Sequence, residues 1–248
     1  MEKSEVANLK IEIANLEKAS TYKTEVISIS AHELRTSLTA LKWILGMFLD
    51  GDTGELTDKQ RKFIEKSLER VERMIRLSQE MLLINHNQAD DLSYDWKMLD
   101  LGEILDGVLF DFQGEFHKNN IELVFLEPRE PMSKIRGDAD KVRVVIQNLL
   151  ENSIKYTPAG GRVIVSLSKH GDMAELSVQD SGIGIPESDA TNLFTKFYRG
   201  DLAKKTHAFG SGLGLYTAKK ILAAHQGNIW FERNTDKGVT FFISLPLS

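Results

Sequence analysis

The sequence predicts a multi-domain chain, in which an all-α helical hairpin forming a dimeric four-helix bundle precedes an α+β two-layer sandwich. Two observations support this. The N-terminal third carries apolar residues at alternating spacings of three and four, the pattern of amphipathic helices. After a polar, irregular stretch at residues 87–98, helical patterns mix with short alternating runs bounded by turn residues. That mixture is typical of helices that cover one face of a mixed sheet.

The composition is that of an ordinary globular protein and argues against several classes. Of 248 residues, 42% are hydrophobic and 27% are charged. The net charge of -5 disfavours a general nucleic-acid binder, which needs a concentrated basic face. The absence of cysteine excludes disulfides and thiolate metal sites. No apolar run approaches the roughly 18 residues that cross a bilayer, so we expect a cytoplasmic segment without membrane contact.

Residues 1–50 are predicted to form one long helix. Its first heptads carry the seam of a coiled coil or of a short amphipathic helix. The apolar stripe that follows consists of Ile27, Ala31, Leu34, Leu38, Leu41, Leu45 and Phe48. A second amphipathic helix begins at Thr57, with Gln60 completing a capping box, and ends near Asn85. Two antiparallel helices cannot bury both stripes, so we expect a homodimer.

The second half is predicted to form the sandwich. Strands are expected at 121–127, 162–169, 173–179, 227–233 and 239–245. Helices are expected at 101–118, from a cap at Asp138 to Tyr156, and at 211–225. We therefore expect a coiled-coil linker at 1–22, a helical domain at 23–88, a linker at 89–98 and the sandwich at 99–248.

His32 in the predicted first helix has two polar neighbours. The helical register places His32 outside the apolar stripe, with Glu33 beside it. Thr36 lies one turn farther along the same face, because residues at i and i+4 are neighbours on a helix. An imidazole next to a carboxylate and a hydroxyl favours proton and phosphoryl chemistry. The alternative is an ordinary exposed histidine.

The helix that ends at Tyr156 carries two amides and a cation on one face. Asn148, Asn152 and Lys155 stand at i, i+4 and i+7, opposite an apolar stripe. Amide oxygens are hard donors that suit Mg²⁺, and the lysine can neutralise phosphate. The alternative reading is a solvated helix face.

Two glycine motifs favour the binding of a nucleotide. Asp180 ends a strand before Gly182 and Gly184, so its carboxylate can accept a hydrogen bond from an amine such as that of adenine. The run Gly210–Leu215 opens a helix, where backbone N–H groups favour anions. It fails as a dinucleotide fingerprint, because no strand leads into it. For the first motif, the alternative is a tight turn. The aromatic run Leu193–Arg199 lies between the two motifs and could bring Arg199 to phosphate, and the alternative for this run is an aromatic patch of the core.

These motifs, in this order, resemble those of sensor histidine kinases of two-component systems, from about residue 20 onward. The phospho-acceptor box is His32–Thr36, and the asparagine box is Asn148–Tyr156. The two glycine boxes are Asp180–Gly184 and Gly210–Gly214, with the phenylalanine box, Phe194–Phe197, between them. The catalytic domain of this family also resembles those of type II topoisomerases and heat-shock chaperone ATPases.

The resemblance implies an ATP- and Mg²⁺-dependent kinase that phosphorylates His32 and passes the phosphoryl group to a response-regulator receiver domain. Residues 23–88 would be the dimerisation and phospho-acceptor domain of a soluble protein or of a membrane-anchored sensor. Glu33 would be the base, and Thr36 would position a water that hydrolyses the phosphorylated regulator. Asn152 would bind magnesium with help from Asn148. The nucleotide would be bound by Lys155, Tyr156 and Arg199 at the phosphates, by Asp180 at adenine, and by Gly182, Gly184, Gly210, Gly212, Leu213 and Gly214.

Two positions bear on the alternatives. The ATPase relatives carry a glutamate where this chain has Asn148, and an amide cannot activate water, so a simple ATPase is disfavoured. Many family members carry proline where this chain has Ser37, and serine keeps the helix N–H. A signalling scaffold that binds nucleotide without catalysis is the remaining alternative. Four intact residues argue against it, namely His32, Glu33, Asn152 and Asp180.

Overall fold

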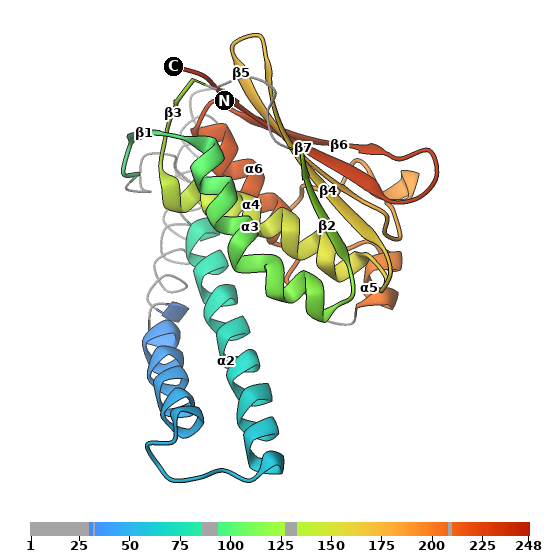
Figure 1. Cartoon of the computed structure of the whole chain (residues 1–248). Coiled ribbons are helices and arrows are strands. Elements are labelled where there is room, and N and C mark those ends of the chain that lie inside the picture. Colours follow the sequence, from blue (N-terminus) through green and yellow to red (C-terminus); the bar gives the residue numbers. More distant parts are fainter. Residues whose placement is uncertain (1–29, 32, 86–93, 127–132, 208–209) are drawn as a thin grey trace, which may run out of the picture. The chain divides into compact units, whose positions relative to one another are not determined.

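The computed structural model describes residues 30–31, 33–85, 94–126, 133–207 and 210–248 (Figure 1). The chain divides into two compact units, Met1–Leu92 and Ser93–Ser248. The coiled coil expected at 1–22 and the phospho-acceptor candidate His32 lie outside the described residues. Within the described part of the chain, no helix is long and apolar enough to cross a membrane.

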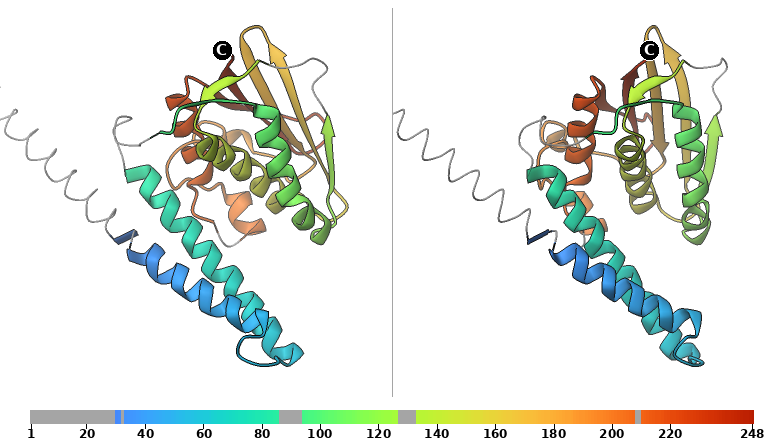
Figure 2. Two further views of the ribbon diagram at one scale, coloured as in Figure 1. Left: turned by 60° about the vertical axis from the view of Figure 1, so that its left-hand side comes forward. Right: turned by 90° about the vertical axis from the view of Figure 1, so that its left-hand side faces the viewer.

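The first unit is the predicted helical hairpin. Residues 30–31 and 33–50 are helical, and α2 (Asp58–Asn85) runs back alongside them (Figure 2). The capping box is confirmed, because the Thr57 N–H donates to Gln60 Oε1 at 3.0 Å and the Gln60 N–H donates to Thr57 Oγ1 at 3.4 Å. These reciprocal bonds satisfy donors that the first turn of a helix leaves unpaired.

Part of the apolar stripe of the hairpin is exposed. Val71 of α2 is 3% exposed, whereas Leu34 and Leu41 of the first helix are 54% and 41% exposed. A single hairpin therefore leaves large apolar side chains in water. Such a surface is typical of a helix pair that packs against another chain.

The second unit contains a mixed five-stranded sheet in the order β2-β4-β5-β7-β6. The strands are β2 (Glu122–Leu126), β4 (Arg162–His170), β5 (Met173–Asp180), β6 (Asn228–Arg233) and β7 (Val239–Pro246). β2 pairs with β4 in parallel, and the other neighbours pair antiparallel. The predicted α+β class is confirmed.

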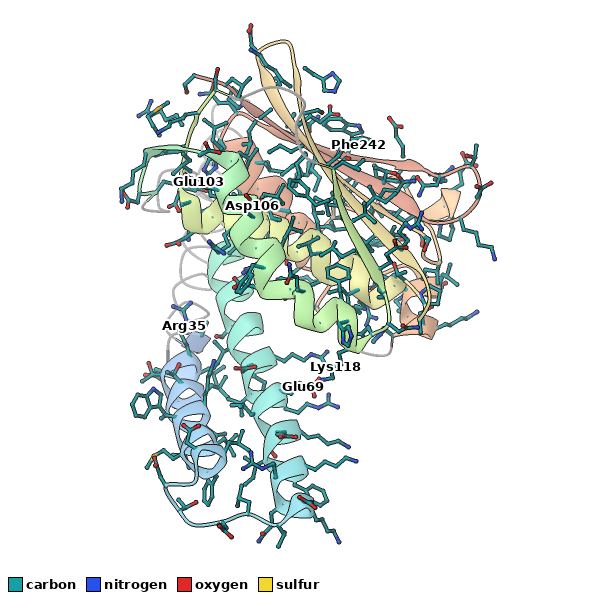
Figure 3. All side chains as sticks on the ribbon, viewed as in Figure 1. Arg35, Glu69, Glu103, Asp106, Lys118 and Phe242 are labelled. Carbon is teal, nitrogen blue, oxygen red and sulfur yellow. The ribbon has the colours of Figure 1, made fainter. Side chains whose placement is uncertain are left out.

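Three helices cover one face of this sheet (Figure 1). They are α3 (Leu101–Lys118), α4 (Ala139–Tyr156) and α6 (Gly214–Ala224). The predicted cap of α4 is present, since Asp138 Oδ1 accepts a hydrogen bond from the Lys141 N–H at 3.1 Å. Phe241 and Ile243 of β7 point into the core, whereas Phe242 between them stacks on Trp230 across the opposite face (Figure 3).

Three features differ from the sequence prediction. β1 (Lys97–Leu99) and β3 (Ile135–Gly137) form a two-stranded antiparallel sheet that was not predicted, because three residues are too few to show alternation. Two further short helices, η1 (Glu187–Asp189) and α5 (Asp201–Thr206), follow β5. α6 begins at Gly214 rather than at residue 211, because the preceding Gly212 has a φ of +69°, in the left-handed region.

Candidate functional site

The predicted nucleotide motifs lie together in the second unit. The end of α4, the loop after β5 and the loop before α6 meet at glycines. A Cβ built on Gly182 would lie 2.5 Å from the Tyr156 carbonyl oxygen, and one on Gly214 would lie 2.9 Å from Asn148 Oδ1. Because a real Cβ could not approach so closely, glycine is what allows these segments to touch. The structure thus brings the asparagine box and both glycine boxes into contact.

Asp180 lies at the end of β5 within this cluster. It is 4% exposed, and its Oδ1 accepts hydrogen bonds from the N–H groups of Gly182 at 2.8 Å and Val239 at 3.4 Å. Burial raises the pKa of the Asp180 carboxyl to about 6, against the opposing effect of these two donors. Among the residues that the structure describes, none donates to Oδ2. That second oxygen can accept a hydrogen bond from a ligand amine.

The start of α6 presents backbone N–H groups without a side-chain cap. The first turn of a helix has unpaired donors and a positive partial charge, which together favour phosphate. The N-cap residue, Leu213, is buried and only 1% exposed. Nearby, Asn148 Nδ2 is buried without a hydrogen-bond partner among the described residues. A buried unpaired amide is costly, so a bound acceptor here would stabilise the site.

Two cations lie against Gly210. A Cβ there would lie 2.8 Å from Lys155 Nζ and 3.2 Å from Arg199 Nε. The Arg199 guanidinium donates to the carbonyl oxygens of Ala203 in α5 and of His207 and Gly210 in the loop before α6. Arg199 therefore holds this loop in addition to any contact with phosphate, a role that the sequence did not suggest.

The phenylalanine box divides between core and surface. Phe194 packs against the hydrophobic core, with its ring centroid 6.3 Å from that of Phe231. Phe197 is 61% exposed and has a φ of +65°, which costs a non-glycine residue about 1 kcal/mol or more. Strain of this kind is often found at functional sites. Phe194 therefore anchors the box to the core, and Phe197 turns the chain sharply at the end of the box.

The oxygen donors fit a magnesium ion that is held largely by a nucleotide. Asn152 is partly exposed on α4, one turn beyond Asn148, so both amides belong to the same helix face. Mg²⁺ commonly takes one or two protein ligands together with substrate phosphates and water. Within the described residues, no group of three or more His, Cys, Asp or Glu could hold a metal ion on its own.

The described part of the phospho-acceptor box lies on the first helix of the hairpin. Glu33 and Thr36 are exposed, as the register predicts for the face that carries His32, and Ser37 is exposed as well. The helix runs without a break from residue 33 to residue 50. Serine at position 37 retains its N–H, which fits this continuity, because proline would remove a helix hydrogen bond.

Sequence reasoning missed the contacts that support Asp180. Asn234 donates a hydrogen bond to the Asp180 carbonyl oxygen, across 54 positions in the chain. A Cβ on Gly238 would lie 1.9 Å from that same oxygen. The run from 234 to 238 has the residues of a hairpin turn, but a turn pattern does not reveal which strand end it packs against.

Comparison with known proteins agrees with this geometry. Residues 137–248 match the family described as histidine kinase-, DNA gyrase B- and HSP90-like ATPases. Residues 22–90 match the His kinase A (phospho-acceptor) domain. The chain thus joins a phospho-acceptor helical domain to an ATPase-type α/β domain. It belongs to the sensor histidine kinases of two-component systems.

Individual relatives cover nearly the whole chain. Sensor histidine kinase WalK of Bacillus subtilis is 30% identical over 95% of this chain and 38% of its own length. Adaptive-response sensory kinase SasA of a Synechococcus strain is 30% identical over 98% of this chain and 64% of its own length. The chain therefore spans less than two thirds of either relative.

Solved structures agree on the fold. Full-length ShkA, crystallised in complex with AMPPNP, superposes with a TM-score of 0.71 at 24% identity, covering 90% of this chain and 46% of that one. The catalytic domain of histidine kinase ThkA gives a TM-score of 0.55 at 27% identity, covering 62% of this chain and 96% of that one.

Proposed function

We propose that this chain is an ATP- and Mg²⁺-dependent protein histidine kinase that phosphorylates its own His32. Residues 23–88 would form the dimerisation and phospho-acceptor domain, and residues 99–248 the ATP-binding domain. The observation that carries the proposal is that Asn148, Asp180 and the Gly210–Gly214 loop meet in one site of the second unit, in a chain whose sequence also contains an intact phospho-acceptor box.

Each residue of the nucleotide site has a distinct role in this proposal. Asp180 accepts a hydrogen bond from the adenine amine, and Lys155 and the start of α6 hold phosphate oxygens. Tyr156 and Arg199 complete the phosphate side, and Arg199 also fastens the loop over it. Asn152 would hold magnesium, with Asn148 assisting, and the bound ion would neutralise phosphate charge.

Transfer requires a nucleophile and a base on the hairpin. A ring nitrogen of His32 forms a bond to the γ-phosphorus of ATP while the bond from that phosphorus to the β,γ-bridging oxygen breaks, and ADP leaves. Glu33 accepts the hydrogen bond of the other ring nitrogen and takes its proton. Asn148 lacks the carboxylate that would activate water, so the site favours transfer over hydrolysis.

The phosphoryl group then passes from His32 to an aspartate of a response-regulator receiver domain. Thr36 orients the water that later hydrolyses the aspartyl phosphate. The exposed Leu34 and Leu41 support a homodimer in which two hairpins form a four-helix bundle. Light scattering should give about twice 28.0 kDa, and a monomer at micromolar concentration would contradict the bundle.

The direct test is incubation of the chain with Mg²⁺ and γ-labelled ATP. The wild-type chain should gain acid-labile phosphate, and His32→Gln should gain none while still binding ATP. The matched control is His117→Gln, which removes an exposed histidine of α3 and should be labelled like wild type. A wild-type chain that binds ATP without taking up label would instead support the scaffold alternative.

A further inference from the structure

The turn between β6 and β7 packs directly on the strand end that carries Asp180. Gly238, in this turn, has a φ of +90°, and its α-carbon lies so near that a Cβ would fall 1.9 Å from the Asp180 carbonyl oxygen. The Asn234 side chain, at the other side of the turn, donates from Nδ2 to the same oxygen at 3.0 Å. Two residues of one turn thus converge on the main chain of Asp180.

The oxygen of the Asn234 side-chain amide is also hydrogen-bonded. Thr240 Oγ1 donates to Asn234 Oδ1 at 2.7 Å, and the Asn234 N–H closes the turn on the Gly238 carbonyl oxygen at 3.3 Å. The orientation of the amide follows from chemistry, because a main-chain carbonyl can only accept and must therefore face the NH₂ group. The side chain is fixed at both ends.

Asn234 supports Asp180 at the point where the regular sheet ends. The last β5–β7 pair is Gln179 with Thr240, so Asp180 stands one residue beyond that ladder. The next residue of β7, Val239, donates its N–H to the Asp180 carboxylate instead, at 3.4 Å. Asn234 therefore replaces a missing ladder bond and fixes the backbone from which the carboxylate projects.

We propose that Asn234 is a positioning residue for purine recognition, and that it sets the preference for a 6-amino purine by aiming Asp180 Oδ2 at the exocyclic amine. This inference rests on the proposed function, in which Asp180 contacts adenine. Asn234 itself need not touch the nucleotide. The β6–β7 turn thus contributes to the nucleotide specificity of the site, although it carries none of the family motifs.

The test compares ATP with purine riboside 5′-triphosphate, which has hydrogen in place of the amine. Both dissociation constants are measured on the full chain by calorimetry, with Mg²⁺ present. Wild type should prefer ATP. Asn234→Ala should weaken ATP binding about tenfold, the scale of one hydrogen bond to a charged group, and should leave the binding of purine riboside triphosphate unchanged. Equal weakening of both ligands, or an unchanged ATP preference, overturns the inference.

Three further variants separate positioning from simple loss of folding. Thr240→Ser keeps the hydroxyl and should retain the ATP preference, whereas Thr240→Val should lose much of it. Asn228→Ala removes an exposed asparagine from the same hairpin and should behave like wild type. If Thr240→Val keeps the full preference, the network does not position Asp180 and the inference fails.

The failure of the inference and that of the proposed function give different results. A wild-type chain that binds both triphosphates equally overturns adenine recognition by Asp180, and the inference with it. A wild-type chain that prefers ATP, together with an Asn234→Ala chain that keeps this preference, overturns the inference alone.

Discussion

His225 accepts a hydrogen bond from the Asp138 N–H through Nε2, at 3.0 Å, and so ties the end of α6 to the start of α4. Its Nδ1 lies 2.8 Å from the Ile221 carbonyl oxygen, which can only accept. The neutral ring with hydrogen on Nδ1 satisfies both bonds, whereas a protonated ring would place two donors face to face. Trp96 packs on this ring, with centroids 4.8 Å apart. α4 and α6 are therefore linked by a hydrogen bond at the ends that lie opposite their nucleotide motifs.

This relationship predicts a pH-dependent stability. Burial lowers the pKa of His225 below its usual 6.5. The unfolded chain then binds the proton more readily, so the contribution of His225 to folding is complete above 6.5 and is lost as the pH falls through the pKa of the folded state. His225→Gln should cost about 1–3 kcal/mol at neutral pH. Urea unfolding should show this difference shrinking on acidification, and a constant difference would refute the linkage.

Asp180 should have the opposite effect on stability. Its carboxyl titrates near pH 6 when folded, against 3.8 as a free group. Ionising it therefore costs the folded state up to about 3 kcal/mol, a penalty that is absent below 3.8 and complete once the pH has risen through 6. Asp180→Asn should stabilise the second unit at neutral pH while losing ATP binding. Thermal unfolding at two pH values tests this, and a variant less stable than wild type at neutral pH would contradict it.

Gly238 and Gly171 offer a matched comparison of crowding and strain. Both have a positive φ in a hairpin turn, but a Cβ on Gly171 would meet nothing within 4 Å. Gly171→Ala should cost about 1 kcal/mol, the price of the left-handed conformation alone. Gly238→Ala should cost clearly more and should weaken ATP binding, because the methyl group must push Asp180 away. Equal losses of stability in the two variants would show that the crowding is relieved without consequence.

Thr36 should separate the two activities of the hairpin. Thr36→Ala keeps a good helix former on an exposed face, so autophosphorylation and transfer should stay within a few-fold of wild type. Dephosphorylation of the regulator should slow roughly tenfold to a hundredfold, the scale of one positioned catalytic group. The decay of purified phosphorylated regulator with ADP present measures this effect. Identical decay with both proteins would leave Thr36 as a plain surface residue.

Much of the fold could be predicted because its elements carry local signals. The capping residues Thr57 and Asp138 marked helix starts, and the alternation along β4 and β5 marked a hairpin. The sequence predicts the start of α6 three residues too early, because nothing in the local pattern shows that Gly212 adopts a left-handed conformation.

The candidate site likewise contains residues that local motifs predict and residues that only long-range contacts reveal. Asn148, Asp180 and the glycines occur in short motifs, so their chemistry could be inferred from neighbouring residues. Asn234 and His225 act through contacts that span 54 and 87 positions. An asparagine in a turn and a histidine at a helix end are ordinary locally, and only the folded chain shows what they hold.

The most direct test of the central claim is to identify the residue that receives phosphate from ATP. The full chain is incubated with ATP and Mg²⁺ at neutral pH, digested without acid, and analysed by tandem mass spectrometry. We predict phosphate on the ring of His32 in the wild-type chain and none in Asp180→Asn, which cannot hold the nucleotide. Phosphate on a different residue, or phosphate on His32 that persists in Asp180→Asn, would contradict the account.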